Sequence, residues 1–290
     1  MTRRMLEFGL TFFLAISINF FLPRLIPGDP LKLIAGSAAP QLGKERVEAL
    51  RAQYGLDKPL HEQYVIYLKQ LARGDLGMSF RYSGGRTVVE VLTENFRWTL
   101  LLVGISLILA LLIGSALGIW SATRRGDPLD LGLLSSIYVL RSIPPFWIAM
   151  LLIPILAIQL RLFPVGDSYS IPRLEGWENI KDVARHTAMP VFVLTLAYIP
   201  TAFSIMRASM FGIMESDYIR TARAKGIPNI GVVLKHGVRN ALLPVLTSFM
   251  VDLGQLLGGV TVIEAVFNYR GLGNMMFEAV KSRDYPLLQG

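Results

Sequence analysis

The sequence contains no cysteine and little else that performs chemistry. Among its 290 residues there are only three histidines, His61, His186 and His236, which are too far apart to indicate a metal site. Without cysteine the chain has no disulfide framework, no thiol nucleophile and no cysteine-ligated metal site. These absences exclude the common redox and metal-centred functions.

Motifs that bind nucleotides or activate nucleophiles are also missing. The sequence has no Gly-x-x-x-x-Gly-Lys-Ser/Thr phosphate loop, no His-Glu-x-x-His pair and no Gly-x-Ser-x-Gly turn. We therefore expect no catalysis, no metal and no cofactor on this chain. If the process it serves consumes ATP, separate subunits must hydrolyse that ATP.

The sequence has few charged residues and many hydrophobic ones. Charged residues make up 17% of the chain and hydrophobic residues 52%, and the mean hydropathy is +0.47. That value is too apolar for an ordinary soluble domain. The net charge of +8 lies in loops between apolar runs, which favours lipid headgroups over nucleic acid. We predict an all-α membrane protein with no nucleic-acid partner.

Five apolar runs are long enough to cross a bilayer, and a sixth begins at Pro286. We expect this sixth span to be truncated, because the sequence stops at Gly290. The third run is interrupted by two adjacent prolines, which are expected to kink the helix. The five complete predicted spans cover residues 8–23, 98–123, 131–160, 187–206 and 240–263.

The distribution of Lys and Arg predicts the orientation. The loop 207–239 carries six basic residues against two acidic ones, so we place it in the cytoplasm. Arg3 and Arg4 place the N-terminus on the same side, ahead of an apolar run that we interpret as an uncleaved anchor. The segment 24–97 would then be external. Its eleven basic residues are compatible with that, since long loops translocate largely regardless of charge.

The external segment is predicted to be ordered. Apolar residues at helical spacing indicate one helix ending at Gly55 and another from Leu60 to its end at Gly74. Residues 88–97 suggest an interfacial helix leading into the second span. We accordingly divide the chain into residues 1–97, an anchor with an ordered external segment, and residues 98–290, the core transmembrane domain.

The stretch 217–244 is the longest polar, basic stretch between apolar runs. We predict a short helix capped by Asp217, a corner at Gly226 and a second helix with Pro228 in its first turn. Gly226 is expected to adopt a positive φ. An apolar face and a basic face are expected on the short helix. The apolar face consists of Tyr218, Ile219 and Ala222. The basic residues are Arg220, Arg223 and Lys225.

This stretch resembles the cytoplasmic coupling loop, or EAA loop, of ABC importer permeases. The residues Asp-Tyr-Ile-Arg-Thr-Ala-Arg-Ala-Lys-Gly at 217–226, followed by Arg-Asn-Ala-Leu-Leu-Pro at 239–244, are similar to the dipeptide/oligopeptide/nickel branch. Arg220 and Thr221 stand where the wider superfamily has Glu and Ala, and no contact of that Glu carries over. Further similar segments follow in order: Pro-Gly-Asp-Pro at 27–30, Gly-Leu-Asp-Lys-Pro-Leu at 55–60, Ile-Pro-Pro-Phe-Trp at 143–147 and Arg-Asp-Tyr-Pro-Leu-Leu-Gln-Gly at 283–290.

The resemblance implies the transmembrane domain of a type I ABC importer in the cell inner membrane, with its coupling loop at 215–240. The implied partners are a homologous permease chain forming a heterodimer, two ATP-binding subunits that hold ATP and Mg, and an extracytoplasmic substrate-binding protein. Peptide uptake is the implied function. The alternatives are nickel chelates or oligosaccharides within the family, and a self-contained secondary carrier or channel outside it.

The resemblance also implies roles for single residues. Tyr218, Ile219 and Ala222 would be buried anchors in a groove of the ATPase, whereas Arg220, Arg223 and Lys225 would meet acidic groups or the membrane surface. Gly226 would end the coupling helix, and Gly226→Asp is expected to uncouple transport while leaving the protein inserted.

Two charged residues, Arg141 and Asp252, fall inside predicted spans, where charge is costly. Three interpretations remain open for them. They pair with each other, they contact a partner permease chain, or they line the pathway and meet the charged termini of a zwitterionic substrate.

Overall fold

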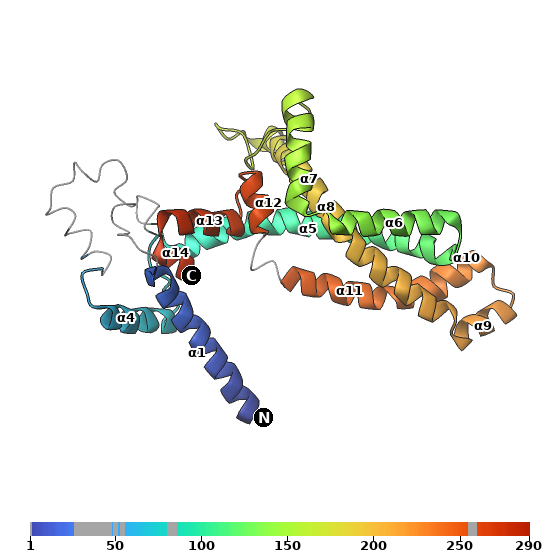
Figure 1. Cartoon of the computed structure of the whole chain (residues 1–290), viewed down its shortest axis with the longest axis horizontal. Coiled ribbons are helices and arrows are strands. Elements are labelled where there is room, and N and C mark those ends of the chain that lie inside the picture. Colours follow the sequence, from blue (N-terminus) through green and yellow to red (C-terminus); the bar gives the residue numbers. More distant parts are fainter. Residues whose placement is uncertain (1, 26–47, 49–51, 53–55, 80–85, 255–259) are drawn as a thin grey trace. The chain divides into compact units, whose positions relative to one another are not determined.

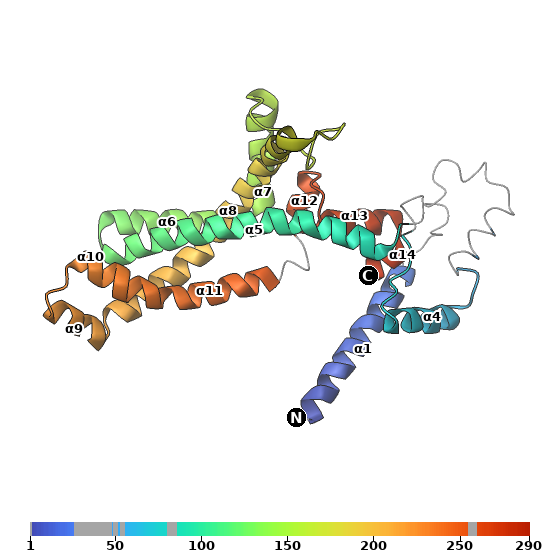
Figure 2. The same ribbon diagram turned by 180° about the vertical axis from the view of Figure 1, so that it is seen from behind.

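The computed structural model describes residues 2–25, 48, 52, 56–79, 86–254 and 260–290 (Figures 1 and 2). The secondary structure within these ranges is helical, apart from an isolated β-bridge between Met78 and Thr87. The chain forms two compact units, Met1–Asn95 with Met275–Gly290, and Phe96–Asn274. Each unit is described separately below.

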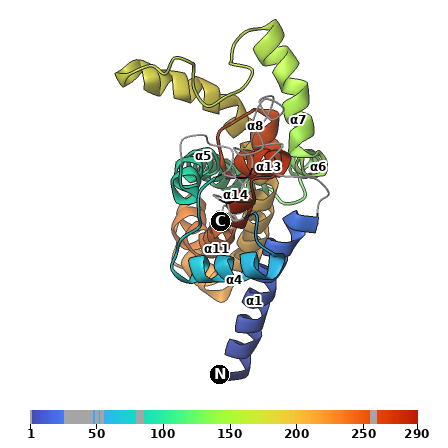
Figure 3. The same cartoon turned by 90° about the vertical axis from the view of Figure 1, so that its left-hand side faces the viewer.

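The first unit contains the anchor and the external segment. Helix α4 (Leu60–Ala72) confirms the predicted helix, and Gly74 follows it with a φ of +73°. The other predicted helix, ending at Gly55, lies largely outside the described residues. Helix α4 lies beside α1, where the hydroxyls of Ser17 and Tyr64 are 2.6 Å apart (Figure 3). The unit comprises α1 (Thr2–Leu25), α4, the start of α5 (Val88–Thr123), the end of α13 (Leu272–Ser282) and α14 (Tyr285–Gln289).

The second unit is built around α8 (Gly176–Met214), against which α6, α7, α11 and α12 pack. Its largest apolar cluster joins side chains from α5, α7, α8 and α12, among them Leu102, Ala149, Val193 and Phe267. The other elements of this unit are the remainder of α5, α6 (Pro128–Ser142), α7 (Pro145–Leu152), π-helix η2 (Ile153–Gln159), α9 (Asp217–Ala224), α10 (Asn229–Gly231), π-helix η3 (Val232–Val238), α11 (Arg239–Gly254) and α12 (Thr261–Val266).

Within the described residues, three helices are long and apolar enough to cross a membrane: α1 over Arg4–Leu22, α5 and α8. A fourth span exists if α6 and α7–η2 count as one span, broken by a bend of 89°. The third predicted span is therefore a sharply broken helix. The break follows from Pro144 and Pro145, since a residue that precedes proline is driven to extended backbone and Ile143 has ψ 121°.

The remaining predicted spans are not confirmed as single helices. Helix α11 has 16 residues and ends at Gly254, and the separate helix α12 begins at Thr261. Part of this predicted span, residues 255–259, lies outside the described residues. The predicted interfacial helix at 88–97 is the first part of the 36-residue helix α5. The predicted sixth span corresponds only to the short helix α14.

Candidate functional site

Helix α9 is attached to its own chain by two side chains from its apolar face. Ile219 is 0% exposed and Ala222 is 5% exposed, and both pack in a small cluster with Val232 of η3. Ile213, Met214 and Ile227 complete this cluster. The spacing of three residues brings Ile219 and Ala222 onto one side of the helix, as the sequence predicts. In this chain the two residues are already buried, so they hold α9 in place and leave other residues to face a partner.

The cap of α9 differs from the prediction. Asp217 is the first helical residue, and Ser216 occupies the N-cap position with extended backbone. The Ser216 hydroxyl donates backward to the carbonyl oxygen of Ile213 at 2.6 Å, and its own carbonyl accepts from the amides of Ile219 and Arg220. The prediction that Asp217 caps this helix is wrong, because its side chain points to solvent and meets Arg220 at 3.4 Å.

The exposed side of α9 is basic. Tyr218, which the apolar pattern grouped with Ile219, is 44% exposed, and its hydroxyl accepts from Asn240 at 3.3 Å. The basic residues of the helix and its C-cap are all exposed, namely Arg220, Arg223 and Lys225. Together with Tyr218 they form the exposed surface of α9, and we call these four residues the α9 outer surface.

The corner after α9 has the expected backbone. Gly226 has a φ of +73°, which confirms the predicted positive value. A side chain at this position would meet no atom within 4 Å, so the constraint is backbone conformation and not space. The amide of Ile227 reaches back to the carbonyl of Ala222 at 3.4 Å and closes the turn. Pro228 takes the N-cap position of α10, one residue earlier than predicted.

The chain beyond the corner ties α9 to two long helices. η3 packs against α9 and against α8, and it continues directly into α11. At Gly237 an added side chain would lie 3.3 Å from the Met210 methyl and from the Met214 sulfur, so η3 approaches α8 closely. Figure 2 shows α9 at the end of the arm formed by α8 and α11. A displacement of α9 would therefore be transmitted to both helices.

A buried ion pair, which the sequence analysis did not identify, lies near this end of α8. Arg207 donates from Nη2 to the Asp130 carboxylate at 2.9 Å and from Nε to the Ser121 hydroxyl at 2.6 Å. Asp130 also accepts from the Ser121 hydroxyl and, at 3.2 Å, from the amide of Gly126. The Asp130 side chain is 1% exposed. This pair joins α5, α6 and α8 at one end of the unit.

Asp252 lines a cavity in the middle of the second unit. The cavity has a volume of about 760 Å³, and its lining includes Tyr198, Thr201 and the Pro144–Pro145 corner. A smaller void of about 20 Å³ is also lined by Tyr198, Thr201 and Asp252, together with Ser248 and other residues. Asp252 makes no hydrogen bond or ion pair with any residue that the structure describes.

Arg141 does not join this cavity. It lies in the last turn of α6, just before the break at Ile143, and its side chain is exposed. Among the described residues no ion pair links Arg141 to Asp252. Of the three interpretations of these two residues, pairing with each other is therefore the one that no described contact supports.

A second buried carboxylate organises the turn between α12 and α13. Glu264 is 0% exposed, accepts from the Thr99 hydroxyl at 2.7 Å and accepts from the amide of Asn274 at 3.0 Å. A side chain on Gly271 would lie 2.3 Å from the Glu264 carboxylate, so glycine is required there. Arg270, which stands where the resembling family usually has proline, donates its amide to the Ser168 hydroxyl at 2.8 Å.

Comparison with known proteins assigns the chain to a family. Residues 114–290 match the family model described as binding-protein-dependent transport system inner membrane component, and residues 1–102 match the model for the N-terminal part of such proteins. These two matches cover the apolar helices, the arm that carries α9 and the α12–α13 turn.

Individual relatives are similar along nearly the whole chain. A putative peptide permease protein of Brucella suis is 38% identical over 97% of this chain and 87% of its own length. The oligopeptide transport system permease protein AppB of Bacillus subtilis is 36% identical over 93% and 84%. The glutathione transport system permease protein GsiC of Escherichia coli is 35% identical over 99% and 88%. These matches confirm the resemblance inferred from the motifs, and the chain belongs to the family of binding-protein-dependent transport system inner membrane components, multi-pass proteins of the inner membrane.

Proposed function

We propose that this chain is a permease subunit of an ATP-driven importer of peptides, with α9 as the joint to an ATP-hydrolysing subunit. The observation that carries the proposal is the arrangement of α9. Its buried residues Ile219 and Ala222 fix it to α8 and η3, while its outer surface presents a tyrosine and three cations. The names of the relatives, which are peptide, oligopeptide and glutathione permeases, support peptides as the substrate class.

In this proposal the subunit works with several partners. A homologous permease forms a heterodimer with it, two ATP-binding subunits hold ATP and Mg, and an extracytoplasmic binding protein delivers the substrate. In this arrangement the N-terminus and α9 face the cytoplasm. Closure of the ATP-binding subunits displaces α9, and the connection through η3 converts this displacement into rocking of α8 and α11.

The cavity at Asp252 is our proposed part of the pathway. It lies between the broken helix α6–α7 and the bundle helices α8 and α11, and transporter sites are commonly framed by such interrupted helices. Asp252 has no partner among the described residues, which favours the pathway or partner-chain interpretation over pairing with Arg141.

Purification from a membrane that contains the candidate partners tests the proposal. We expect the chain to be recovered in detergent with a sister permease and ATP-binding subunits. We also expect a peptide-loaded binding protein to stimulate ATP hydrolysis by this complex. Stimulation only by a binding protein loaded with a nickel chelate or an oligosaccharide would transfer the proposal to that substrate. A self-sufficient oligomer that transports without ATP would overturn it in favour of a carrier or channel.

Gly226 provides a specific prediction about the joint. A β-branched residue at φ +73° costs about 1–2 kcal/mol, whereas asparagine or aspartate tolerates this conformation better. Gly226→Val is therefore a sharper test than Gly226→Asp. We expect Gly226→Val to lower substrate-stimulated ATP hydrolysis by about tenfold, since a strain of 1.4 kcal/mol shifts a conformational equilibrium by that factor.

Gly226→Asn is the matched control for this prediction. It adds a side chain of similar size at a position with no atom within 4 Å, yet asparagine readily adopts a positive φ. Membrane insertion is expected to be unchanged in both variants. Full stimulation in Gly226→Val would mean that the joint lies elsewhere on the chain.

A further inference from the structure

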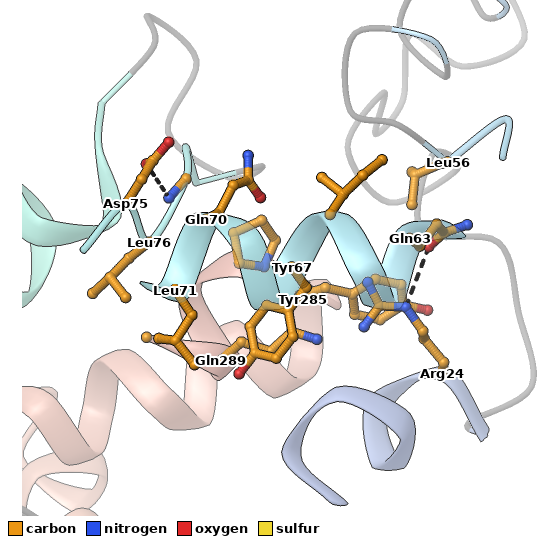
Figure 4. A pocket seen from close by; sticks show the side chains of 14 residues that line it. Arg24, Leu56, Gln63, Tyr67, Gln70, Leu71, Asp75, Leu76, Tyr285 and Gln289 are labelled. Atoms are coloured by element: carbon orange, nitrogen blue, oxygen red, sulfur yellow. Dashed lines mark hydrogen bonds between the residues drawn. The ribbon is translucent and has the colours of Figure 1, made fainter. Parts of the chain in front are cut away.

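A small pocket lies in the first unit, and its lining shares no residue with α9 or with the Asp252 cavity. It has a volume of about 110 Å³, and it is formed by the end of α1, one side of α4, the turn after α4 and α14 (Figure 4). A void of this size holds several water molecules or one compact polar group. Its polar lining residues are Arg24, Gln63, Tyr67, Gln70, Asp75 and Gln289.

Arg24 is a cation in this pocket whose contacts with described residues are all to neutral groups. Its Nη1 donates to the carbonyl of Phe20 at 2.8 Å and its Nε to Gln63 Oε1 at 3.4 Å, and both acceptors are neutral. The guanidinium carbon lies 3.6 Å from the Phe20 ring centroid and 5.0 Å from that of Tyr285. Arg24 forms no ion pair with any residue that the structure describes. Burial lowers the pKa of Arg24 to about 10, so it remains protonated at neutral pH.

A second donor in the pocket lacks an acceptor. Gln289 Nε2 is buried and has no hydrogen-bond partner among the described residues. The nearest carboxylate in the lining belongs to Asp75, whose Oδ1 accepts from the amide of Gly77 at 2.9 Å. Figure 4 shows Asp75 and Arg24 toward opposite ends of the pocket. The charges of Arg24 and Asp75 therefore balance over the pocket as a whole. At the Arg24 end, however, the guanidinium has only neutral acceptors among the described residues, and the Gln289 amide has none, which is the chemistry of an anion site.

The position of this pocket in the chain indicates the level of lipid headgroups. Arg24 follows the apolar span Arg4–Leu22 by two residues. Phe20, Phe21 and Tyr64 form a cluster there, with ring centroids 5.0–5.2 Å apart, as in the aromatic belt at a membrane interface.

Helix α4 has the properties of an interfacial helix. None of its residues is buried, and its apolar residues Leu60 and Val65 are 53% and 47% exposed. A helix that presents apolar side chains without burying them against its own unit is suited to the boundary between headgroups and acyl chains.

We propose that this pocket binds the phosphate of an anionic phospholipid. The side of the membrane rests on the proposed function, in which the N-terminus is cytoplasmic and the pocket therefore lies at the outer face. The Arg24 guanidinium would bind two phosphate oxygens, since its planar donors match that geometry. Gln289 would donate to a third oxygen or to the glycerol. A net negative lipid is favoured over phosphatidylcholine, because the quaternary ammonium of the latter already neutralises its phosphate. The bound headgroup would link α1, α4 and α14, so it would stabilise the first unit.

The test uses the assembled transporter purified in detergent and stripped of lipid. Phosphatidylglycerol, phosphatidylcholine or inorganic phosphate is then added, and lipid binding is measured by native mass spectrometry together with thermal stability. We expect phosphatidylglycerol to bind and to raise the melting temperature more than phosphatidylcholine. Arg24→Gln is expected to weaken phosphatidylglycerol binding by about tenfold, since it removes a charge-assisted contact. Arg73→Gln is the matched control, because Arg73 is exposed at the end of the same helix α4.

A second variant keeps the proposal testable if Arg24→Gln fails to fold. Gln63→Glu places a carboxylate beside Arg24, so it supplies the missing counter-ion from within the chain. We expect it to stabilise the lipid-free complex and to abolish the effect of phosphatidylglycerol. Undiminished lipid binding in Gln63→Glu and Arg24→Gln would overturn the proposal. Equal stabilisation by inorganic phosphate would reassign the pocket to a free anion. The Arg24→Gln complex can also be assayed in phosphatidylcholine without any anionic lipid. If the binding protein then no longer stimulates its ATP hydrolysis, the pocket would be reassigned to an acidic group of the binding protein.

Discussion

Arg207→Met is expected to destabilise the unit of residues 96–274 by about 3–5 kcal/mol, which is the usual cost of leaving one member of a buried ion pair alone. The Asp130 carboxylate is 1% exposed, and in the variant it would keep only the Ser121 hydroxyl and the Gly126 amide as donors. Methionine fills a similar volume, so the loss would come from charge and hydrogen bonds and not from a cavity. The measurement is thermal unfolding of the purified complex, together with its abundance in the membrane.

Two further variants separate this pair from its surroundings. Arg125→Gln is the matched control. Arg125 stacks on the Phe211 ring at 4.8 Å, and its ion-pair partner, Glu215 at 3.4 Å, is exposed. An exposed pair of this kind contributes less than about 1 kcal/mol. The double variant Asp130→Leu with Arg207→Met is expected to recover most of the lost stability, because no unpaired charge remains buried. If Arg207→Met and Arg125→Gln cost the same, the buried pair has no special role.

This ion pair shows what the sequence analysis could not provide. Asp130 directly precedes the third predicted span and Arg207 directly follows the fourth, and the orientation count places both at the cytoplasmic side. One acid and one base at the same membrane face are a signal for pairing. The sequence does not show which helices are neighbours, however. The charged residues that stand out in it are Arg141 and Asp252, because they lie inside apolar runs. The structure pairs Asp130 with Arg207, and among the described residues no ion pair joins Arg141 to Asp252.

Helix α9 was more accessible to prediction, because its signals are local. The helix, its end at Gly226 and the positive φ there follow from side-chain spacing and from the conformational freedom of glycine. The residues that cover the apolar face could not be predicted from the sequence. Helical periodicity indicates that Ile219 and Ala222 are buried, but it does not show which residues they pack against. The contact with Val232 depends on η3 folding back, which is a tertiary event.

The number of spans was the least predictable feature. Hydropathy alone treats 131–160 as continuous, whereas backbone chemistry divides it. At Ile143 the following proline enforces extended backbone. Such a break is tolerated at membrane depth only where the protein or a cavity satisfies the freed backbone groups, and Pro144 and Pro145 line the Asp252 cavity.

The contact between α5 and α8 leads to the second large expected effect. Gly114 and Gly118 lie one turn apart on α5 and face α8. A side chain on Gly114 would lie 2.8 Å from the Ala202 Cβ and 2.9 Å from the Ile199 carbonyl oxygen. On Gly118 it would lie 2.9 Å from the Met206 Cβ and 2.9 Å from the Phe203 carbonyl oxygen. This is the small-xxx-small arrangement that lets membrane helices approach closely.

We expect Gly118→Leu to cost about 3 kcal/mol, at the upper end of the range for overpacking. The atoms in its way include backbone, which cannot rotate aside, so α5 and α8 would have to separate. In a bilayer no hydrophobic gain from water holds helices together, so the loss of close packing is not compensated. Because Met206 is adjacent to Arg207, separation would also pull on the buried ion pair with Asp130.

Gly104→Leu is the matched control for this prediction, since Gly104 lies on the same helix and a side chain there would meet no atom within 4 Å. We expect Gly104→Leu to leave thermal stability and transport close to those of the parent, and Gly118→Leu to lose both. Equal losses in the two variants would point to a general effect of leucine in α5 and would contradict the close α5–α8 contact. Loss of transport with unchanged stability in Gly118→Leu would instead mean that the contact must open and close during transport, so that α8 moves against α5 when α9 is displaced.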